Sequence, residues 1–182
     1  MTNTSATGGY LSPIGSPADE DDALAALFQS ACAGITGLSG DLVRPRWQVN
    51  PPKQPEPSTT WAAIGVTTTT PDFGPCTEVG NSAATASRHE LIEVLCSFYG
   101  PGAQASATRW RNGLAIPQNG DTLRSSGIVF VSCGPSLPSP ELVNQQWVRR
   151  FDVATTFRRK ISNTYNILTL QSGDVSINTD IQ

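Results

Sequence analysis

The segment His89-Glu90-Leu91-Ile92-Glu93 is the one place where a histidine and two glutamates sit together in this chain. Imidazole and carboxylate groups are the usual zinc ligands and general acid–base catalysts. The zinc-protease pattern H-E-x-x-H needs two histidines on one helical face, but His89 is the only histidine in the sequence. We therefore expect no metal site here, and nothing in the segment indicates a cofactor.

The same segment has the period of a strand rather than of a helix. Four apolar residues fall on one side of an extended chain: Ile92, Val94, Cys96 and Phe98. The opposite side is mixed, so residues 88–99 are predicted to form a long central strand that packs through one face and ends at Gly100-Pro101-Gly102. Glu90 and Glu93 would then lie on opposite faces, which excludes a paired acid and base.

Other catalytic patterns are missing from the sequence. It contains no G-x-S-x-G, no phosphate-binding P-loop and no G-x-G-x-x-G. A Ser–His–Asp triad would have to use His89, and nothing directs a serine towards it. We do not expect an enzyme, and a small hydrolase using His89 is the least favoured alternative.

Composition narrows the functional classes. The 182 residues suit one domain, and the net charge of −3 argues against nonspecific binding to a nucleic-acid backbone. Charged residues make up 15% of the chain, against about 25% in an average domain. A polar but weakly charged surface fits a protein with wide protein contacts, and it also fits a loop-rich monomer.

The charges are unevenly distributed. The acidic cluster is Asp19, Glu20, Asp21 and Asp22, and the basic residues of one predicted strand are Arg149, Arg150, Arg158 and Arg159, followed by Lys160. The simplest interpretation is an acidic helix start together with a strand whose cations form salt bridges or protect a sheet edge. Phosphate binding is less favoured, because the cations fall on both faces and near both ends of the strand.

Cysteine usage and hydropathy indicate the compartment. Cys32, Cys76, Cys96 and Cys133 lack metal-ligand spacing, so we expect buried free thiols in a reducing compartment. The first ten residues have neither a basic start nor an apolar core, and no apolar run approaches the ~20 residues that span a bilayer. The expectation is a soluble protein made in the cytoplasm, with no membrane partner.

Two main helices are predicted. The first opens with Ser16 as N-cap and Pro17 at the first helical position, and it stops by Gly34 to Gly37. Its apolar stripe is Leu24, Leu27, Phe28, Ala31 and Ile35. The second spans about 102–114 and buries Ala103, Ala107, Trp110 and Leu114. A short helical turn is expected at 121–124.

The remaining segments are predicted to be strands and loops. Residues 38–47 are expected to form a turn and then an extended piece, for which Pro45 indicates an edge position. Strands are expected at 60–69, at 127–133 (buried) and at 145–160, with a short final strand or turn at 163–170. In the 145–160 strand one face carries Trp147, Arg149, Phe151, Val153, Thr155, Phe157 and Arg159. Loops are expected at 50–57, 71–87 and 134–140; the first is a rigid connector in preference to an SH3-type ligand, and the second is a contact surface.

These elements define the expected architecture. Residues 1–17 form a flexible N-terminal arm, 18–170 a single domain, and 171–182 a polar C-terminal tail. The fold class is α/β in the broad sense (α+β): a mixed, mainly antiparallel sheet of about 4–6 strands packed against two main helices.

Several segments resemble the phage neck-terminator, or tail-terminator (tail-completion), family of long-tailed phages. The resemblance runs from about residue 20 to 170. It rests on Asp41–Gln48 followed by Asn50-Pro51-Pro52, on Thr60–Gly65, on Arg88-His89-Glu90, on Val94–Pro101, and on Glu141–Asn144 with Gln146–Arg150.

The resemblance implies a structural virion protein. The proteins that this chain resembles are small α/β subunits that form rings, commonly hexamers. These rings cap the tail tube and join it to the head connector in the virion neck. DNA would pass through the lumen without specific binding, and the family implies no catalytic residue and no cofactor. The alternative is a head–tail connector or adaptor (head-completion) protein that binds the portal.

A ring needs two complementary surfaces on every subunit. We therefore take the acidic cluster and the four arginines as candidate subunit-interface residues: Asp19, Glu20, Asp21, Asp22, Arg149, Arg150, Arg158 and Arg159. In this hypothesis the basic strand of one subunit meets the acidic helix start of the next.

Overall fold

The computed structural model describes residues 9–143 and 145–168. Their contacts divide these residues into two compact units. The core unit comprises residues 17–74 and 88–161, and the small unit takes in residues 9–16, 75–87 and 162–168 of the described chain. Each unit is described by itself.

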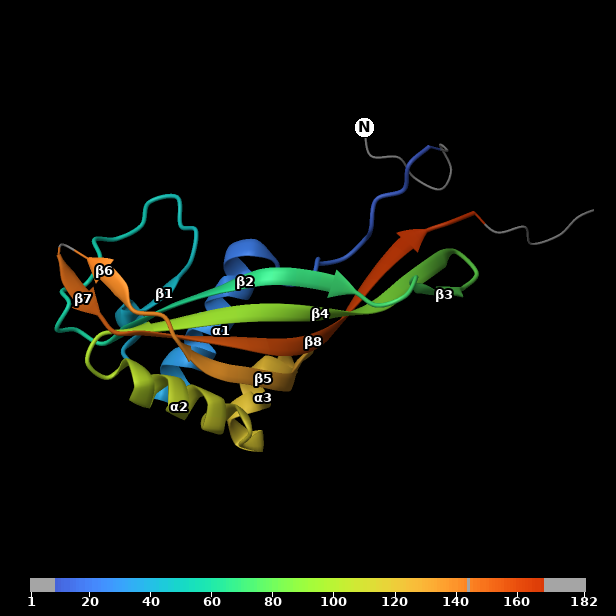
Figure 1. Ribbon diagram of the computed structural model, residues 1–182. Coiled ribbons are helices and arrows are strands. Elements are labelled where there is room, and N and C mark those ends of the chain that lie inside the picture. The colour runs from blue at the N-terminus through green and yellow to red at the C-terminus, as the bar shows by residue number, and fades with distance from the viewer. Residues whose placement is uncertain (1–8, 144, 169–182) are drawn as a thin grey trace, which may run out of the picture. The chain divides into compact units, whose positions relative to one another are not determined.

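A mixed β-sheet organises the core unit (Figure 1). Its strands are β1 (Val43–Pro45), β2 (Trp61–Pro71), β4 (Ala83–Tyr99), β5 (Ile128–Pro138) and β8 (Arg150–Asn166), of which β4 and β8 also enter the small unit. The order is β1-β2-β4-β8-β5. Strand β1 pairs with β2 in parallel, whereas β2–β4 and β5–β8 are antiparallel. The predicted mixed, mainly antiparallel α+β fold is confirmed.

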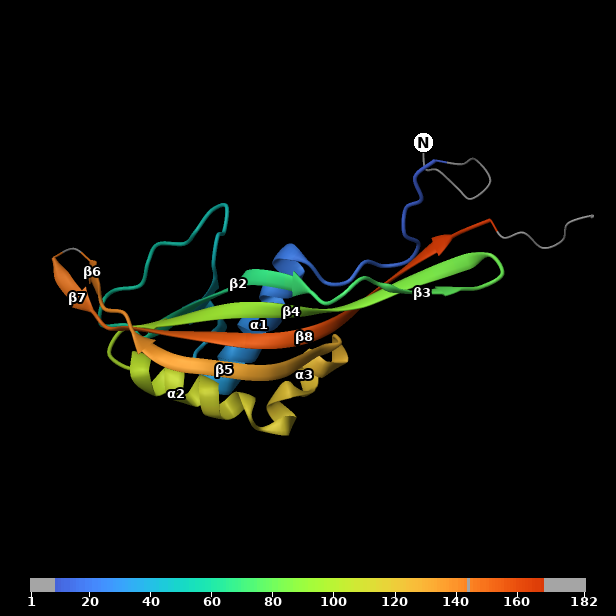
Figure 2. The same ribbon diagram turned by 45° about the vertical axis from the view of Figure 1, so that its right-hand side comes forward.

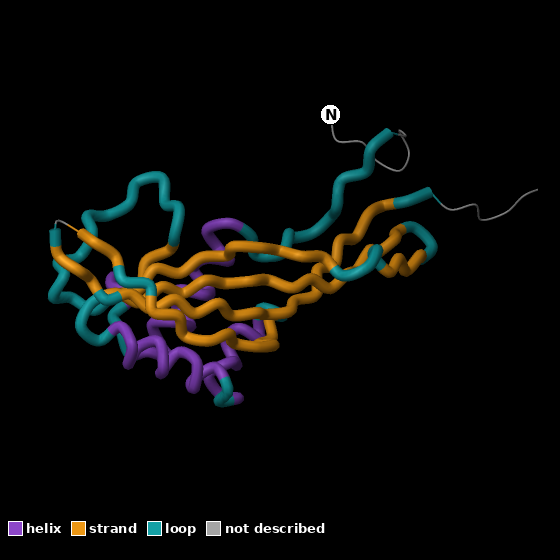
Figure 3. The backbone as a smooth tube through the Cα atoms, in the orientation of Figure 1, coloured by secondary structure: helices purple, strands orange, loops and turns teal. Residues whose placement is uncertain are grey.

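Helices cover one face of this sheet, as Figures 2 and 3 show from two directions. They are α1 (Asp21–Thr36), α2 (Ala103–Leu114) and the short α3 (Asp121–Ser125), with two 3₁₀ turns, η1 (Gly40–Leu42) and η2 (Pro117–Gly120). The core includes Leu24, Phe28, Cys32, Ala103, Ala107, Trp110, Leu114 and Leu123 from these helices. Both predicted apolar stripes therefore face the sheet.

The central strand β4 has the predicted alternation. Its buried face toward the helices consists of Ile92, Val94, Cys96 and Phe98. Glu90 lies two residues before Ile92 on the same face of the strand and is also buried, with 3% of its surface exposed. Glu93 is exposed, so the two glutamates lie on opposite faces as predicted. Period two explains all of these positions.

The other face of the sheet is only partly covered in the described part of the chain. On β4, Leu91 and Leu95 are partly buried, and Glu93 between them on the same face is exposed. On β5, Val129 and Val131 each keep 50% of their surface exposed. The core unit is thus a two-layer structure, with helices on one face and a partly open sheet on the other.

The first helix begins later than predicted. The prediction of Ser16 as N-cap and Pro17 as first helical residue is wrong: α1 starts at Asp21, and its N-cap is Glu20 in an extended conformation. The backbone carbonyl of Glu20 accepts hydrogen bonds from Ala23 and Leu24. The chain just before the helix is bound by Arg159, as described below, and this contact sets where the helix starts.

The single strand predicted at 145–160 is also wrong. Residues Gln146–Val148 form β7, which pairs with β6 (Glu141–Val143) in a separate hairpin, and β8 begins only at Arg150. The break falls at Arg149, whose carbonyl accepts a hydrogen bond from the Gly100 amide. Trp147 consequently lies outside the core, with 72% of its surface exposed. Residues 153, 155, 157 and 159 are buried on one face as expected.

Strand β5 is longer and more exposed than predicted. It continues from Ile128 to Pro138, so the loop predicted at 134–140 is mostly strand. Its register shifts between Phe130 and Ser132 and again between Cys133 and Ser136. Prolines are tolerated there because β5 is an edge strand with one unpaired side.

The other edge strand matches the prediction in part. Pro45 does lie in an edge strand, but β1 ends at Pro45 and excludes Trp47. The following loop joins β1 to β2, as predicted for a connector. The Arg44 guanidinium holds this loop by donating to the carbonyl oxygen of Lys53 at 2.6 Å.

The small unit consists of strands without a buried core. Strand β3 (Cys76–Val79) pairs antiparallel with residues 84–87 of β4, so the loop predicted at 71–87 contains a hairpin. Ile14 donates to the Thr164 carbonyl, and the Thr85 and Thr164 hydroxyls are 3.0 Å apart. Residues 162–166 belong to β8, which corrects the separate final strand predicted at 163–170; residues 169 and 170 lie outside the described chain. Every described side chain of this unit is partly or fully exposed.

The buried hydrogen bond from Trp110 to Thr155 gives a test of the packing between α2 and β8. The indole Nε1 of Trp110 donates to Thr155 Oγ1 at 3.1 Å, and both residues are buried. Thr155→Val leaves the indole N–H unpaired, which should lower the free energy of unfolding by about 1–3 kcal/mol in urea denaturation. Thr156→Val on the partly open face is the control and should stay within about 0.5 kcal/mol. Equal effects of both substitutions would contradict this packing.

Candidate interaction surfaces

Arg159 is a buried cation that joins three segments of the core unit. It is 5% exposed, and its Nε donates to Glu90 Oε1 at 2.5 Å. Its Nη1 donates to the Asp19 carbonyl and its Nη2 to Glu20 Oε1, each at 2.6 Å. Burial acts to lower the pKa of Arg159, but the hydrogen bonds to Glu20 and Glu90 outweigh it, so the pKa lies above its ordinary value.

The acidic cluster is therefore divided between two environments. Glu20 and the Asp19 backbone bind Arg159 of the same chain. Asp21 and Asp22 lie in the first turn of α1, where the helix dipole favours negative charge, and both are exposed. The predicted pairing of basic strand and acidic helix start thus occurs within the chain for Arg159, and Asp21 and Asp22 face solvent.

Arg158 and Arg150 have partners within the chain as well. Arg158 Nη2 donates to Asp72 Oδ2 at 2.5 Å. Arg150 Nε donates to Asp152 Oδ1 at 2.9 Å, a hydrogen bond that raises the pKa of Arg150, and a second contact reaches Glu141 at 3.5 Å. Arg149 differs from these arginines, because its exposed side chain makes no ion pair with the described residues.

Aromatic rings and cations stack at the end of the sheet near β1. Trp61 and Tyr99 are stacked with their ring centroids 4.2 Å apart. Arg44 lies over Trp61 at 5.7 Å, and Arg150 lies over Tyr99 at 5.5 Å. Burial raises the pKa of Tyr99 above its ordinary value. Arg150 also contacts Glu141, so it connects this stack to strand β6 of the β6–β7 hairpin.

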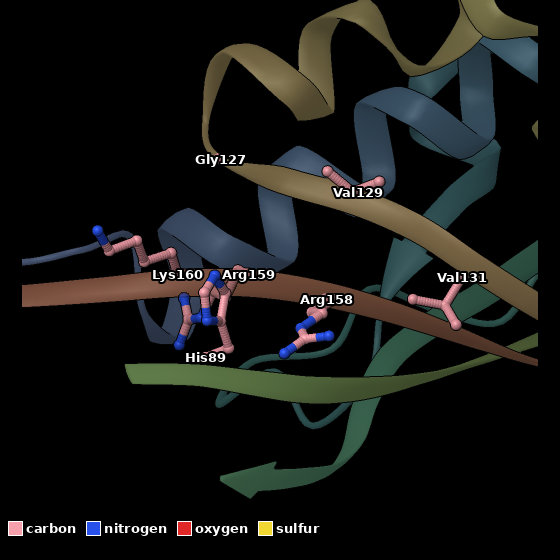
Figure 4. A pocket seen from close by; sticks show the side chains of 7 residues that line it. All are labelled: His89, Gly127, Val129, Val131, Arg158, Arg159 and Lys160. Carbon is pink, nitrogen blue, oxygen red and sulfur yellow. The ribbon is translucent and has the colours of Figure 1, made fainter. Parts of the chain in front are cut away.

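His89 lies in an open depression of about 360 Å³, shown in Figure 4. The other residues around this depression are Gly127, Val129, Val131, Arg158, Arg159 and Lys160. This lining provides cations and apolar surface but no carboxylate or hydroxyl that could serve as the partner of a catalytic histidine. Glu90 and Glu93, the nearest carboxylates in the sequence, bind Arg159 and face solvent respectively.

The cysteines are free thiols in the structure. Cys32 and Cys96 are buried as predicted, and burial raises the pKa of Cys96 well above its ordinary value. Cys133 is partly buried. The prediction fails for Cys76, which is exposed on β3 because the small unit has no core to receive it.

Two exposed apolar groups were missed in the sequence. On the β6–β7 hairpin, Leu142 and Trp147 are directly opposite each other and are 57% and 72% exposed. On the loop between β1 and β2, Trp47 is 71% exposed and Val49 is 96% exposed. Exposed aromatic residues are typical of protein–protein contacts. No local signal in the sequence marks them, since Trp147 fits the alternation of the strand predicted there.

Neither a metal site nor a membrane-spanning helix is found among the described residues. Within residues 9–143 and 145–168, no group of three or more His, Cys, Asp or Glu side chains could hold a metal ion. None of the helices found there is long and apolar enough to cross a bilayer. What these residues do offer is extended surface: a partly open sheet, an unpaired edge strand and exposed aromatic residues.

The described part of the chain is thus an α+β fold with exposed sheet and aromatic surface. In a comparison with protein families, the family described as phage neck terminator protein matches residues 22–181. The chain belongs to this family. No individual curated protein matches it. Membership implies a structural, non-enzymatic component of the virion neck with tail and head partners.

The buried ion pair provides a test of how the helix start is held. Glu90→Leu removes the partner of the buried Arg159 and leaves its Nε without an acceptor. Breaking a buried pair in this way should lower the free energy of unfolding by about 3–5 kcal/mol, measured by urea denaturation. Glu93→Leu, on the opposite face of the same strand, should change it by no more than about 0.5 kcal/mol. A Glu90→Leu protein as stable as the Glu93→Leu protein would refute the anchoring role.

Proposed function

We propose that this protein is a ring-forming tail terminator, which caps the tail tube and joins it to the head connector. The observation that carries the proposal is the family match over residues 22–181. The structure supports it by the kind of surface it presents. A subunit of a closed ring must carry two different, complementary contact surfaces, and it needs no catalytic pocket.

The first proposed contact surface is the hairpin patch, which we define as Leu142, Trp147 and Arg149. Its two apolar residues are more than half exposed, and Arg149 has no ion-pair partner among the described residues. An aromatic anchor beside an unpaired cation is a common centre for a protein interface. The patch lies outside the core because β7 belongs to the separate β6–β7 hairpin and not to the main sheet.

The second proposed contact surface is the exposed start of α1, with Asp21 and Asp22. These carboxylates are complementary in charge to Arg149 of a neighbouring subunit. The set of predicted interface residues becomes smaller. The residues that bind within their own chain are Glu20, Arg150, Arg158 and Arg159. Those that can contact another copy are Asp21, Asp22 and Arg149.

The charge of the chain is compatible with DNA passing through such a ring. A net charge of −3 provides no general attraction to phosphates that would impede sliding. The described basic residues also have acidic partners in several cases, including Arg158 and Arg159. DNA would therefore cross the lumen without specific binding.

The second candidate function is that of a head–tail adaptor bound to the portal. It shares the neck location, and exposed aromatic residues fit it equally well. It differs in symmetry, because a portal-bound adaptor would follow the twelve-fold portal rather than a six-fold tube. Ring symmetry therefore separates the two functions.

Native mass spectrometry and negative-stain microscopy of the full-length protein should show closed rings with six-fold symmetry. Arg149→Glu should shift these rings towards free subunits, because the reversed charge would repel Asp21 and Asp22 of the neighbour. The effect should weaken at high salt, since exposed charges are screened.

Arg111→Glu is the matched control, because Arg111 is exposed on α2 and makes no ion pair with the described residues. It should leave the rings intact. Twelve-fold rings that form only with portal protein would favour the adaptor function. Rings that tolerate Arg149→Glu as well as Arg111→Glu would exclude the proposed charge contact.

A further inference from the structure

An apolar groove with an acidic rim lies between the start of α1, strand β2 and the residues that follow β1. Its volume is about 350 Å³, and its apolar lining includes Leu24, Ile64 and Val66. We call it the α1 groove. The charged residues that line it are Glu20, Asp21, Asp22 and Arg46. Arg159 binds Glu20, and Arg46 donates to the Ser97 hydroxyl, so the exposed carboxylates of Asp21 and Asp22 give the rim its negative charge.

Trp47 lines the groove and lies against the bare backbone of β2. Its φ of 56° falls in the left-handed region, which is rare for a bulky residue. A Cβ atom on Gly65 would lie 2.9 Å from Cζ3 of the Trp47 ring. The ring therefore approaches β2 at a position where only glycine leaves room for it.

Strained backbone marks both the α1 groove and the β6–β7 hairpin. The non-glycine residues with positive φ in the described chain are Asp21, Trp47 and Gln145. Asp21 and Trp47 line the groove, and Gln145 lies in the turn between β6 and β7. Such conformations are concentrated at functional sites, where the surrounding structure holds them in place. This observation is independent of charge and exposure, and it points to the same two surfaces.

The hairpin patch is complementary to the α1 groove. Trp147 is 72% exposed, and Val148 between Trp147 and Arg149 is buried, so the tryptophan and the arginine lie together on the exposed side. A cavity of about 150 Å³ already holds a benzene ring, so a groove of this size has room for an indole. The indole matches the apolar lining, and the guanidinium matches the acidic rim.

We propose that the α1 groove receives the Trp147 side chain of a neighbouring subunit, with Arg149 of that subunit beside Asp21 and Asp22. No residue of the β6–β7 hairpin lines the groove of its own chain. Figure 1 shows the hairpin at one end of the sheet, apart from the start of α1. Donor and acceptor are thus different surfaces of one subunit, and a contact of this head-to-tail kind can close a ring.

This inference rests on the proposed ring and specifies how its subunits are joined. The charge contact between Arg149 and the two aspartates becomes the edge of a contact whose centre is apolar. Trp147 is the anchor, and the groove has one occupant: a second copy of this chain.

Cross-linking between two single-cysteine chains tests the proposal. Both chains carry Cys76→Ser and Cys133→Ser, which removes the two cysteines that are not buried. One chain carries Thr69→Cys at the groove, and the other carries Gln146→Cys beside Trp147. A short bismaleimide should link these two positions in the mixed rings, and such a link necessarily joins two chains. Thr108→Cys, exposed on α2, replaces Thr69→Cys as the control and should give far fewer links.

Truncating the anchor tests the contact without a cross-linker. Trp147→Ala should weaken subunit association by about tenfold or more, measured by native mass spectrometry over a dilution series. Phe73→Ala is the matched control, because Phe73 is also an exposed aromatic residue (96%) and lies outside both surfaces. It should leave the association unchanged.

Blocking the groove tests the acceptor side. Ala25→Arg places a long side chain in the groove, four residues after Asp21 on the same helix, where it would pair with that aspartate and exclude the neighbour. It should weaken association about as much as Trp147→Ala. Ser30→Arg puts the same charge on α1 outside the groove and should have no such effect. The double variant Trp147→Ala with Ala25→Arg should be little weaker than either single variant, since both remove one contact.

The outcomes separate this inference from the proposed function. Rings without links above the Thr108→Cys control, rings as tolerant of Trp147→Ala as of Phe73→Ala, or additive effects in the double variant would overturn the anchor and leave the terminator function standing. Links from Thr69→Cys to tube protein in preference to a second copy would overturn the assigned occupant. Absence of both rings and links would overturn both proposals.

Discussion

The core unit depends on the ion pairs and hydrogen bonds of the Arg159 guanidinium. This guanidinium lies on the buried face of β8, where a cation requires compensation, and Glu90 of the neighbouring strand provides the opposite charge. The remaining donors bind the Asp19 carbonyl and the Glu20 carboxylate immediately before α1. One buried side chain thereby joins β8, β4 and the start of the first helix. The position of α1 over the sheet follows from this contact together with the burial of Leu24 and Phe28.

Covering one face of the sheet has consequences for the rest of the surface. With α1, α2 and α3 on the same face, the opposite face and the edge of β5 are available for contact. The small unit adds paired strands in which every described residue is at least partly exposed. Such exposed surface is compatible with a structural component of the virion neck, which membership of the family of phage neck terminator proteins implies.

Local patterns predicted much of this structure. The period of β4, the apolar stripes of α1 and α2, and the edge position of Pro45 follow from residue spacing, and all are present. The start of α1 could not be read from Ser16 and Pro17, because a side chain about 140 residues away determines it. The break at Arg149 has the same origin, since the Gly100 amide binds there. The burial of Glu90 could have been predicted from the sequence, because Glu90 lies on the same face of β4 as Ile92. Arg159 likewise lies on the same face of β8 as Phe157.

The proposed role of this protein at the end of the tail tube is tested most directly by tube assembly. Purified tube protein should be polymerised with and without this protein, and tube lengths and ends should be recorded by electron microscopy. The account predicts a ring at one end of each tube and an arrest of elongation there. Tubes that keep growing, or rings found on portal protein and never on tube ends, would contradict it.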